Sequence, residues 1–296
     1  MRRHLHRSRG HRVARPVARD DGCMTWNERL ERWGGAASTR QLRSAGVTQR
    51  ELTAAVSSGE LLRPRNGRYA SLSAPHPILV ALSAGSRLCC LSAARTYGLW
   101  GGTDDRIHLA VPPNLGRSGT DAPRIVRHWR RVEEHPEIWR VSFHDCLRTV
   151  VRCADDVTAV AVLDTALTSG RVSPYGLDRI FAGEPQSSRR LAQQARPGSE
   201  SGVESILRQL LESRGHRVEQ QLQVSGVGRV DMRIDGMLLV EVDGFAFHRD
   251  RVRSSVIARA IPRSRCGGCG GSACPLGRCW TIPWPPWMRS SGCWAC

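Results

Sequence analysis

The segment GRVDMRIDGMLLVEVDGFAFH, from Gly228 to His248, decides how this chain is interpreted. It places Asp231 on one apolar run, Glu241 and Asp243 on the next run, and His248 just beyond. A tight turn between the runs would pair them as strands and bring the acids to one edge of a sheet. Carboxylates gathered in this way repel one another unless a cation lies between them. The segment therefore predicts a metal-dependent site.

The residues just before this segment extend it to a small α/β unit over 201–250. Ser201 is expected to cap a helix that ends near Arg214, and Val218–Val224 follows as a strand. The predicted order is a helix and then a three-stranded meander. Glu204 is a further candidate for the acidic site. Ser201-x-x-Glu204 also has the form of a capping box, which would give Glu204 a purely structural role.

The order helix, strand, turn, Arg-Val-Asp, hairpin, Leu-Leu-Val-Glu-Val-Asp-Gly and a later His resembles the PD-(D/E)xK nuclease superfamily. The resemblance is closest to an uncharacterised family related to very-short-patch-repair endonucleases, and it covers about residues 201–248. It implies that Asp231 and Glu241 bind Mg²⁺ or another divalent ion for phosphodiester hydrolysis in DNA. Asp243 stands where many relatives have Lys, which leaves the general base open. His248 matches a family His and has the chemistry of a general acid or base.

Residues 24–72 predict a winged helix-turn-helix. Helices are expected over about 25–33, from Ser38 to Gly46 and from the capping box Thr48-x-x-Glu51 onward, followed by a hairpin around Asn66-Gly67. Polar and basic residues of the third helix and the wing are candidates for contact with DNA phosphates. These residues are Gln49, Arg50, Arg63, Arg65 and Arg68. The alternative is a winged helix that contacts only protein.

Residues 73–182 predict a mixed α/β region. Helices are expected at Ile78–Leu82, Leu88–Tyr97 and Val157–Thr168, and strands at Ile107–Val111 and Ile125–Trp129. No chemistry is assigned to the histidines of these strands, because a single His on a strand is usually structural. The cysteines at 89, 90, 146 and 153 are interpreted as small buried residues. Residues 183–200 are interpreted as a linker.

The stretches GGAASTRQLRSAGVT and SAARTYGLW, in the first 100 residues, carry a second resemblance. They are similar to actinobacterial proteins that have an abortive-infection antitoxin-type winged helix ahead of a nuclease-like domain. This resemblance implies an ancestry shared with antitoxins or transcription factors.

The two ends of the chain have unusual compositions. Residues 1–23 contain seven Arg and no periodic pattern, which indicates either a disordered basic extension or an upstream start with Met24 as the true first residue. Residues 251–296 hold six of the eleven Cys. Cys266-x-x-Cys269 invites a zinc interpretation, but a disordered tail is favoured because no strands frame the Cys pairs. A frameshift after about Asp250 is a further hypothesis, since another frame over 253–265 can encode the Asp-Arg-x-Arg helix of the nuclease family.

The net charge of +17 suggests a polyanionic partner such as DNA, although much of that charge lies in the two ends. No run of about 18 apolar residues predicts a transmembrane helix, and the N-terminus lacks the apolar core of a signal peptide, so a cytoplasmic protein with no membrane partner is expected. The combined prediction is an α/β (α+β) protein that acts as a Mg²⁺-dependent DNA endonuclease. The alternative is a non-catalytic DNA-binding regulator or antitoxin with a decayed or truncated nuclease domain.

Overall fold

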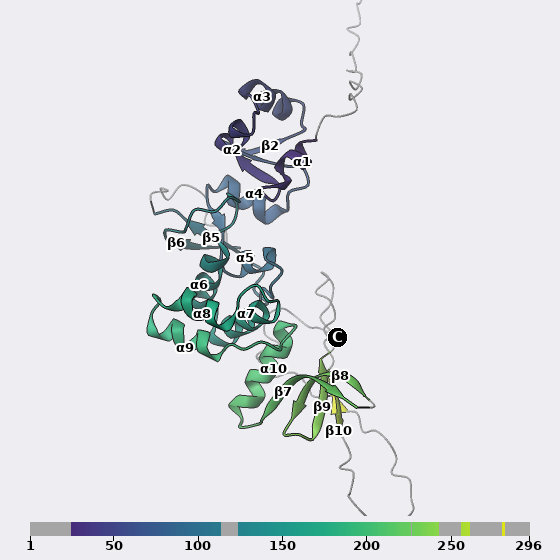
Figure 1. Ribbon diagram of the computed structural model, residues 1–296. Coiled ribbons are helices and arrows are strands. Elements are labelled where there is room, and N and C mark those ends of the chain that lie inside the picture. Colours follow the sequence, from purple (N-terminus) through teal and green to yellow (C-terminus); the bar gives the residue numbers. More distant parts are fainter. Residues whose placement is uncertain (1–24, 114–123, 226, 243–255, 261–279, 282–296) are drawn as a thin grey trace, which may run out of the picture.

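The computed structural model describes residues 25–113, 124–225, 227–242, 256–260 and 280–281. The described residues form a mixed α+β structure with three separate sheets. Figure 1 shows the units following one another in space as they do in the sequence, with residues 25–70 at one end and the last sheet at the other. No helix among these residues has both the length and the apolar character needed to cross a bilayer.

The first unit contains three short helices and a three-stranded sheet. Its elements are α1 (Trp26–Glu31), β1 (Ala36–Ser38), α2 (Thr39–Ser44), α3 (Gln49–Ser57), β2 (Leu62–Arg65) and β3 (Arg68–Ala70), with strand order β1-β3-β2. Each helix begins at a capping box, formed by Thr25, Ser38 and Thr48 with the residue three positions on. The expected helices and hairpin are confirmed. Strand β1 was not expected, because Ala-Ala-Ser forms a strand only through its pairing with β3.

Side-chain hydrogen bonds fix this first unit to the middle of the chain. The Trp139 indole Nε1 donates to the carbonyl oxygen of Trp33 over 2.9 Å. The Gln41 amide donates to the carbonyl oxygen of Pro136 over 2.6 Å. In each of these two hydrogen bonds the donor and the acceptor lie about a hundred residues apart in the sequence. The first unit therefore packs against the middle region.

The middle region packs helices around a small sheet and holds the largest hydrophobic core. Its helices are α4 (His76–Ser83), α5 (Cys90–Thr96), α6 (Phe143–Cys153), α7 (Asp156–Thr168), α8 (Pro174–Phe181) and α9 (Gln186–Gln194). Its strands are β4 (Arg87–Leu88), β5 (Ile107–Val111) and β6 (Ile125–Trp129), in the order β4-β5-β6. Strands β5 and β6 are parallel, with His108 paired to Val126 and Ala110 paired to His128. The predicted helices and strands are present, except that Leu88 lies in strand β4 and the helix after it begins at Cys90; α6, α8 and β4 are additional.

The linker predicted at 183–200 is wrong over half of its length. Helix α9 occupies it and packs against α6, α7 and α8. Its fully buried side chains are the small Ser188 and Ala192, one turn apart, and Leu191 beside them is half-buried against the core. Because Leu191 is the only large apolar residue of α9, the stretch has the polar composition of a linker although it belongs to the core of the region.

The last unit is a helix on a meander, as predicted. Helix α10 (Gly202–Ser213) covers β7 (Val218–Val224), β8 (Gly228–Ile234) and β9 (Leu238–Val242), and its stripe of Val203, Leu207 and Leu211 packs against the buried face of this sheet. Two further strands, β10 (Val256–Ala260) and β11 (Trp280–Thr281), extend the sheet in the order β11-β10-β9-β8-β7. The prediction of a disordered tail at 251–296 is therefore wrong for the residues of β10 and β11. The open edge of β9 offers backbone donors and acceptors, and β10 pairs with them.

A buried ionic network joins this last unit to the middle region. The Asp164 carboxylate on α7 is fully buried and accepts from the Arg208 guanidinium of α10 over 2.7 Å. It also accepts from the Ser205 hydroxyl over 2.6 Å and from the Arg196 backbone N–H over 2.9 Å. Burial raises the pKa of Asp164, although Arg208 and these hydrogen bonds act in the opposite direction. The network fixes where α10, and the sheet beneath it, sits on the rest of the chain.

Candidate functional site

Asp231 lies where strands β8 and β9 stop pairing. Their backbone pairs run from Ile234 with Leu238 to Met232 with Val240 and end there. Beyond that point the Asp231 Oδ2 atom accepts a hydrogen bond from the backbone N–H of Val242 over 2.8 Å. The carboxylate thus occupies the opening between the strands, half-buried, and satisfies an amide that would otherwise lose its ladder partner.

Glu241 belongs to the same face of the sheet as Asp231. Side chains alternate along a strand, and Met232, Val240 and Val242 point into the core beneath α10. Asp231 and Glu241 therefore project from the opposite face, one register step beyond the last backbone pair, Met232 with Val240. Glu241 is exposed, so its carboxylate is accessible from solvent.

Glu204 reaches the same corner of the unit from the start of α10. Its side chain is 5% exposed and accepts from the Glu200 backbone N–H over 2.9 Å and from the Ser201 hydroxyl over 2.8 Å. The Gln221 amide Nε2 donates to Glu204 Oε2 over 3.2 Å and lies 3.5 Å from Asp231 Oδ1. Glu204 thus takes part in the helix start, as the capping interpretation predicts, and also faces Asp231 across one shared amide.

Gln221 was missed by sequence reasoning. Its backbone has φ +50°, an unusual conformation for a residue other than glycine, and it is left unpaired opposite Asp231, between the pairs Gln220 with Met232 and Leu222 with Val230. The strand sequence contains Gln220, Gln221 and Gln223 with no signal that separates them. Only the irregular pairing of β7 shows which amide lies between the two carboxylates.

The electrostatics of this corner disfavour a second negative charge. Burial raises the pKa of Glu204, and the Asp231 carboxylate raises it further, against the lowering effect of the hydrogen bonds from Ser201 and Glu200. A cation beside these acids would relieve the repulsion.

We expect Glu204→Gln to gain stability relative to the parent protein as pH rises. The folded protein holds the Glu204 proton to higher pH than the unfolded chain, so this group's contribution to stability is lost as pH rises through the folded pKa. Glutamine does not titrate. The difference in melting temperature, variant minus parent, should therefore become more positive as pH rises above the ordinary pKa of a glutamate. If the difference stayed constant or fell with pH, ionisation of the buried Glu204 carboxylate would not destabilise the folded protein.

Asp243 and His248, the other two predicted catalytic residues, lie outside the described residues. Within the described ranges, one group of three or more His, Cys, Asp and Glu side chains brings its ligand atoms together, and it is not the acidic corner. Asp231 and Glu241 remain as two oxygen donors. That number suits Mg²⁺, which commonly takes one or two carboxylates and fills its remaining positions with water and substrate oxygens.

The residues predicted to contact DNA separate into two sets. Gln49, Arg50, Arg63 and Arg65 are exposed, at the start of α3 and on β2, and the described side-chain hydrogen bond of Arg63 stays within the hairpin, to Asn66. Arg65 instead donates to the carbonyl oxygen of Ser83, and Arg68 donates to the carbonyl oxygens of Gly85 and Ser86. Burial lowers the pKa of the half-buried Arg68, and the nearby Arg87 lowers it further. The second pair thus holds the hairpin against the middle region.

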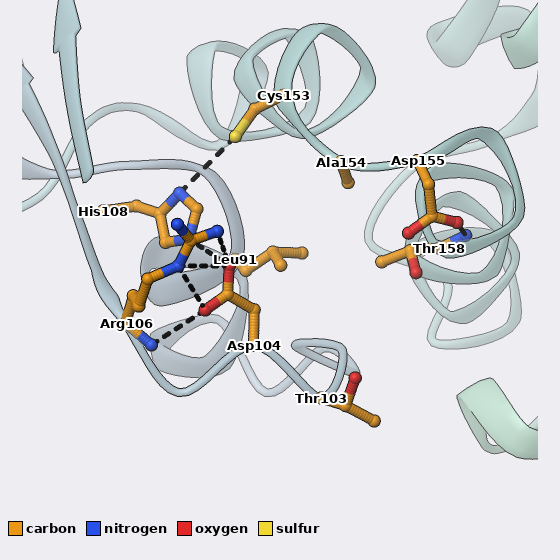
Figure 2. A pocket seen from close by; sticks show the side chains of 9 residues that line it. All are labelled: Leu91, Thr103, Asp104, Arg106, His108, Cys153, Ala154, Asp155 and Thr158. Carbon is orange, nitrogen blue, oxygen red and sulfur yellow. Dashed lines mark hydrogen bonds and ion pairs between the residues drawn. The ribbon is translucent and has the colours of Figure 1, made fainter. Parts of the chain in front are cut away.

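A cluster of two histidines and two cysteines was also missed. His108 on β5, His128 on β6, Cys90 at the start of α5 and Cys153 at the end of α6 place their ligand atoms within 4.8 Å of one another. Figure 2 shows His108 and Cys153 beside Asp104 at the edge of a pocket of about 180 Å³. Sequence reasoning treated the four as separate structural residues, and the first and the last are 63 positions apart in the sequence.

The pKa values of the two thiols of this cluster are shifted in opposite directions. A hydrogen bond from the Cys90 thiol lowers the pKa of Cys153, and hydrogen bonds from His108 and His128 lower it further. The same Cys90–Cys153 hydrogen bond raises the pKa of Cys90, and burial adds to the rise. The cluster therefore favours a thiolate at Cys153.

No protein-family model matches this chain, and no curated protein matches it. Among solved structures, the crystal structure of the RV2827C protein from Mycobacterium tuberculosis is similar to it over 65% of this chain and 84% of that chain. The sequence identity is 20% and the TM-score is 0.28. A TM-score of this size does not establish a shared fold.

Proposed function

We propose that this chain is a DNA-processing protein related to metal-dependent endonucleases, with Asp231 and Glu241 as the metal-binding carboxylates. The observation that carries the proposal is the corner formed by α10, β7, β8 and β9. There Asp231 fills the opening between two strands, Glu241 shares its face, and Glu204 approaches through Gln221. A helix and meander in this order, with acids at these positions, match the nuclease resemblance in the sequence.

The residues present fit a divalent cation. Asp231 and Glu241 offer hard oxygen donors, and the Asp231 carboxylate adds to the rise in the pKa of Glu204 that burial causes. When bound, Mg²⁺ would polarise a phosphodiester oxygen and lower the pKa of water. The protein's own part is to hold the carboxylates in place. The Val242 N–H and the Gln221 amide orient Asp231, so its direction is fixed before substrate arrives.

The first unit is proposed to dock DNA as a winged helix. The element order α1, β1, α2, α3, β2, β3, with strand order β1-β3-β2, supports this proposal. Gln49, Arg50 and Arg63 are exposed and, among the described contacts, make no side-chain hydrogen bond to the middle region, so they are the candidates for phosphate contact. Because Arg65 and Arg68 already bond to carbonyl oxygens of the middle region, they are better placed to fix the angle of this unit than to touch DNA.

We expect purified protein to nick supercoiled plasmid in the presence of Mg²⁺ and the Glu241→Ala variant not to. The physical reason is that alanine removes a metal ligand from an exposed position without opening a cavity. Glu31→Ala is the matched control, because Glu31 is an exposed acid on α1, in a different unit. Nicked and linear products are resolved on a gel over time.

Equal nicking by the parent and Glu241→Ala would rule out the catalytic assignment. DNA binding without nicking by the parent would favour the non-catalytic regulator instead. One observation already favours that alternative. Strand β10 pairs along β9 with Ile257 opposite Glu241, in the part of the chain where the nuclease resemblance implies a helix bearing Asp-Arg-x-Arg.

A further inference from the structure

We propose that Cys90, His108, His128 and Cys153 form a structural zinc site in the middle region. The site is separate from the acidic corner and independent of nuclease activity. Four protein ligands, two sulfur and two nitrogen, complete a tetrahedron and leave no open position, which is the pattern of structural rather than catalytic zinc.

The distances between the ligand atoms match those of a tetrahedral centre. His108 Nδ1 lies 3.2 Å from His128 Nε2, and Cys153 Sγ lies 3.5 Å from His108 Nδ1. With Zn–N bonds of about 2.0–2.1 Å and Zn–S bonds of about 2.3 Å, tetrahedral angles require N···N of about 3.3 Å and N···S of about 3.6 Å. All four ligand atoms, including Cys90 Sγ, lie within 4.8 Å of one another. An ion at the centre therefore requires little movement.

The tautomer of His108 points the correct nitrogen at this centre. The Asp104 carboxylate, ion-paired with Arg106 at 2.7 Å, lies 3.3 Å from His108 Nε2 and can only accept. His108 Nε2 must then carry the proton, which leaves the Nδ1 lone pair facing His128 and Cys153. A carboxylate that orients a ligand histidine in this way is a regular companion of zinc sites.

The fold holds the four ligands from four different elements. His108 and His128 lie on one face of the parallel pair β5–β6, two register positions apart, and their rings stack with centroids 5.5 Å apart. Cys90 has φ +49°, and its N–H donates to the Thr149 hydroxyl of α6 over 3.0 Å. This strained backbone, unusual for a cysteine, turns Cys90 at the start of α5 and is held there by α6.

The donor set also selects the ion. Two thiolates and two neutral imidazoles cancel the charge of Zn²⁺, so the complex is compatible with a setting in which Cys90 and His108 are buried. Hydrogen bonds alone satisfy the cluster less well. Both His128 Nε2 and Cys153 Sγ approach the single Nδ1 atom of His108, and one lone pair cannot serve two donors equally.

The test is metal content of the full chain after purification without added metal, with variants of the cluster. We expect Cys153→Ser and His128→Ala each to lose about one zinc ion per chain relative to the parent. Cys146→Ser and Cys89→Ser are the matched controls and should lose none, because these buried thiols lie outside the cluster. Comparing variants with the parent removes any contribution from the six cysteines of residues 266–296.

A second measurement covers variants that fail to fold. In the parent, Cys90 and Cys153 should resist alkylation until a chelator is added, as read by peptide mass spectrometry. Co²⁺ bound to the chelated parent should give the visible absorption of a tetrahedral thiolate site, and Asp104→Asn should weaken metal binding by about 10–100-fold. Zinc content unchanged in both ligand variants would overturn the proposal. So would a Cys90–Cys153 disulfide, or prompt alkylation of both thiols in the untreated parent.

Discussion

Arg208→Ala is expected to reduce the free energy of unfolding by about 3–5 kcal/mol. The reason is that the substitution leaves the Asp164 carboxylate without its cationic partner. Asp164 is fully buried, and Arg208 is its only charged partner among the contacts described for it. Burial already raises the pKa of Asp164 with Arg208 present. Without the guanidinium, the folded state must either bury an unpaired charge or take up a proton. Urea denaturation at neutral pH measures the loss.

A double variant distinguishes two quantities: the net contribution of the Asp164–Arg208 ion pair to the free energy of unfolding, and the cost of leaving one partner unpaired. Asp164→Asn combined with Arg208→Met removes both charges, and it should cost less than Arg208→Ala alone because no charge remains unpaired. Arg190→Ala, at an exposed position on α9, is the control and should change stability by less than about 0.5 kcal/mol. If the double variant were as unstable as the single one, the loss would come from packing around Arg208 rather than from the uncompensated carboxylate.

The same network has a consequence for the proposed active site. Arg208 and Glu204 lie one turn apart on α10, so the contact that fixes the helix to α7 also fixes where Glu204 faces Gln221. The acidic corner is thus positioned partly by the middle region. A nuclease-like unit cut off at residue 201 would lose that support.

Local signals predicted much of the fold because the physics that sets them is local. The Thr48–Glu51 capping box satisfies backbone amides within one helix turn, and Asn66-Gly67 supplies a residue that tolerates positive φ in a tight hairpin. The meander of β7 to β9 follows from alternating apolar residues and the Asp235-Gly236 turn. Each of these needs no information from distant parts of the chain.

The elements that escaped prediction depend on distant partners. Helix α9 has fully buried side chains only at Ser188 and Ala192, and Leu191 is its single large apolar residue against the core. Strand β10 exists through its pairing with β9, in a stretch whose composition suggested no regular structure. In both cases the stabilising contacts come from elsewhere in the fold, and the local sequence does not record them.

The candidate sites show the same division. Asp231 and Glu241 could be singled out because one hairpin brings them together within about ten residues of sequence. The cysteine and histidine cluster could not, because it requires β5 and β6 to pair in parallel in one particular register and α5 and α6 to bring their ends to the same place. No short spacing such as Cys-x-x-Cys marks it.

Asp231→Asn is expected to reduce the Mg²⁺-dependent nicking rate by about 10³-fold, which corresponds to about 4 kcal/mol of lost transition-state stabilisation. Asparagine has nearly the same shape as aspartate, and its carbonyl oxygen can still accept the Val242 N–H. The substitution removes the negative charge that would bind the metal and keeps the hydrogen bond that closes the strand opening. Stability should therefore change by less than about 1 kcal/mol.

Asp231→Ala separates these two roles of one carboxylate. Alanine removes the charge and also leaves the Val242 N–H without its acceptor, so it should lose about as much activity as asparagine and in addition cost about 1–3 kcal/mol of stability. Nicking rates at saturating Mg²⁺ and urea denaturation of the same preparations provide both readouts. If Asp231→Asn nicked DNA within about tenfold of the parent while Asp231→Ala was unstable, the carboxylate would be a structural replacement for a missing strand pair. In that case Asp231 would not be a metal ligand, and Glu241 would remain as the candidate.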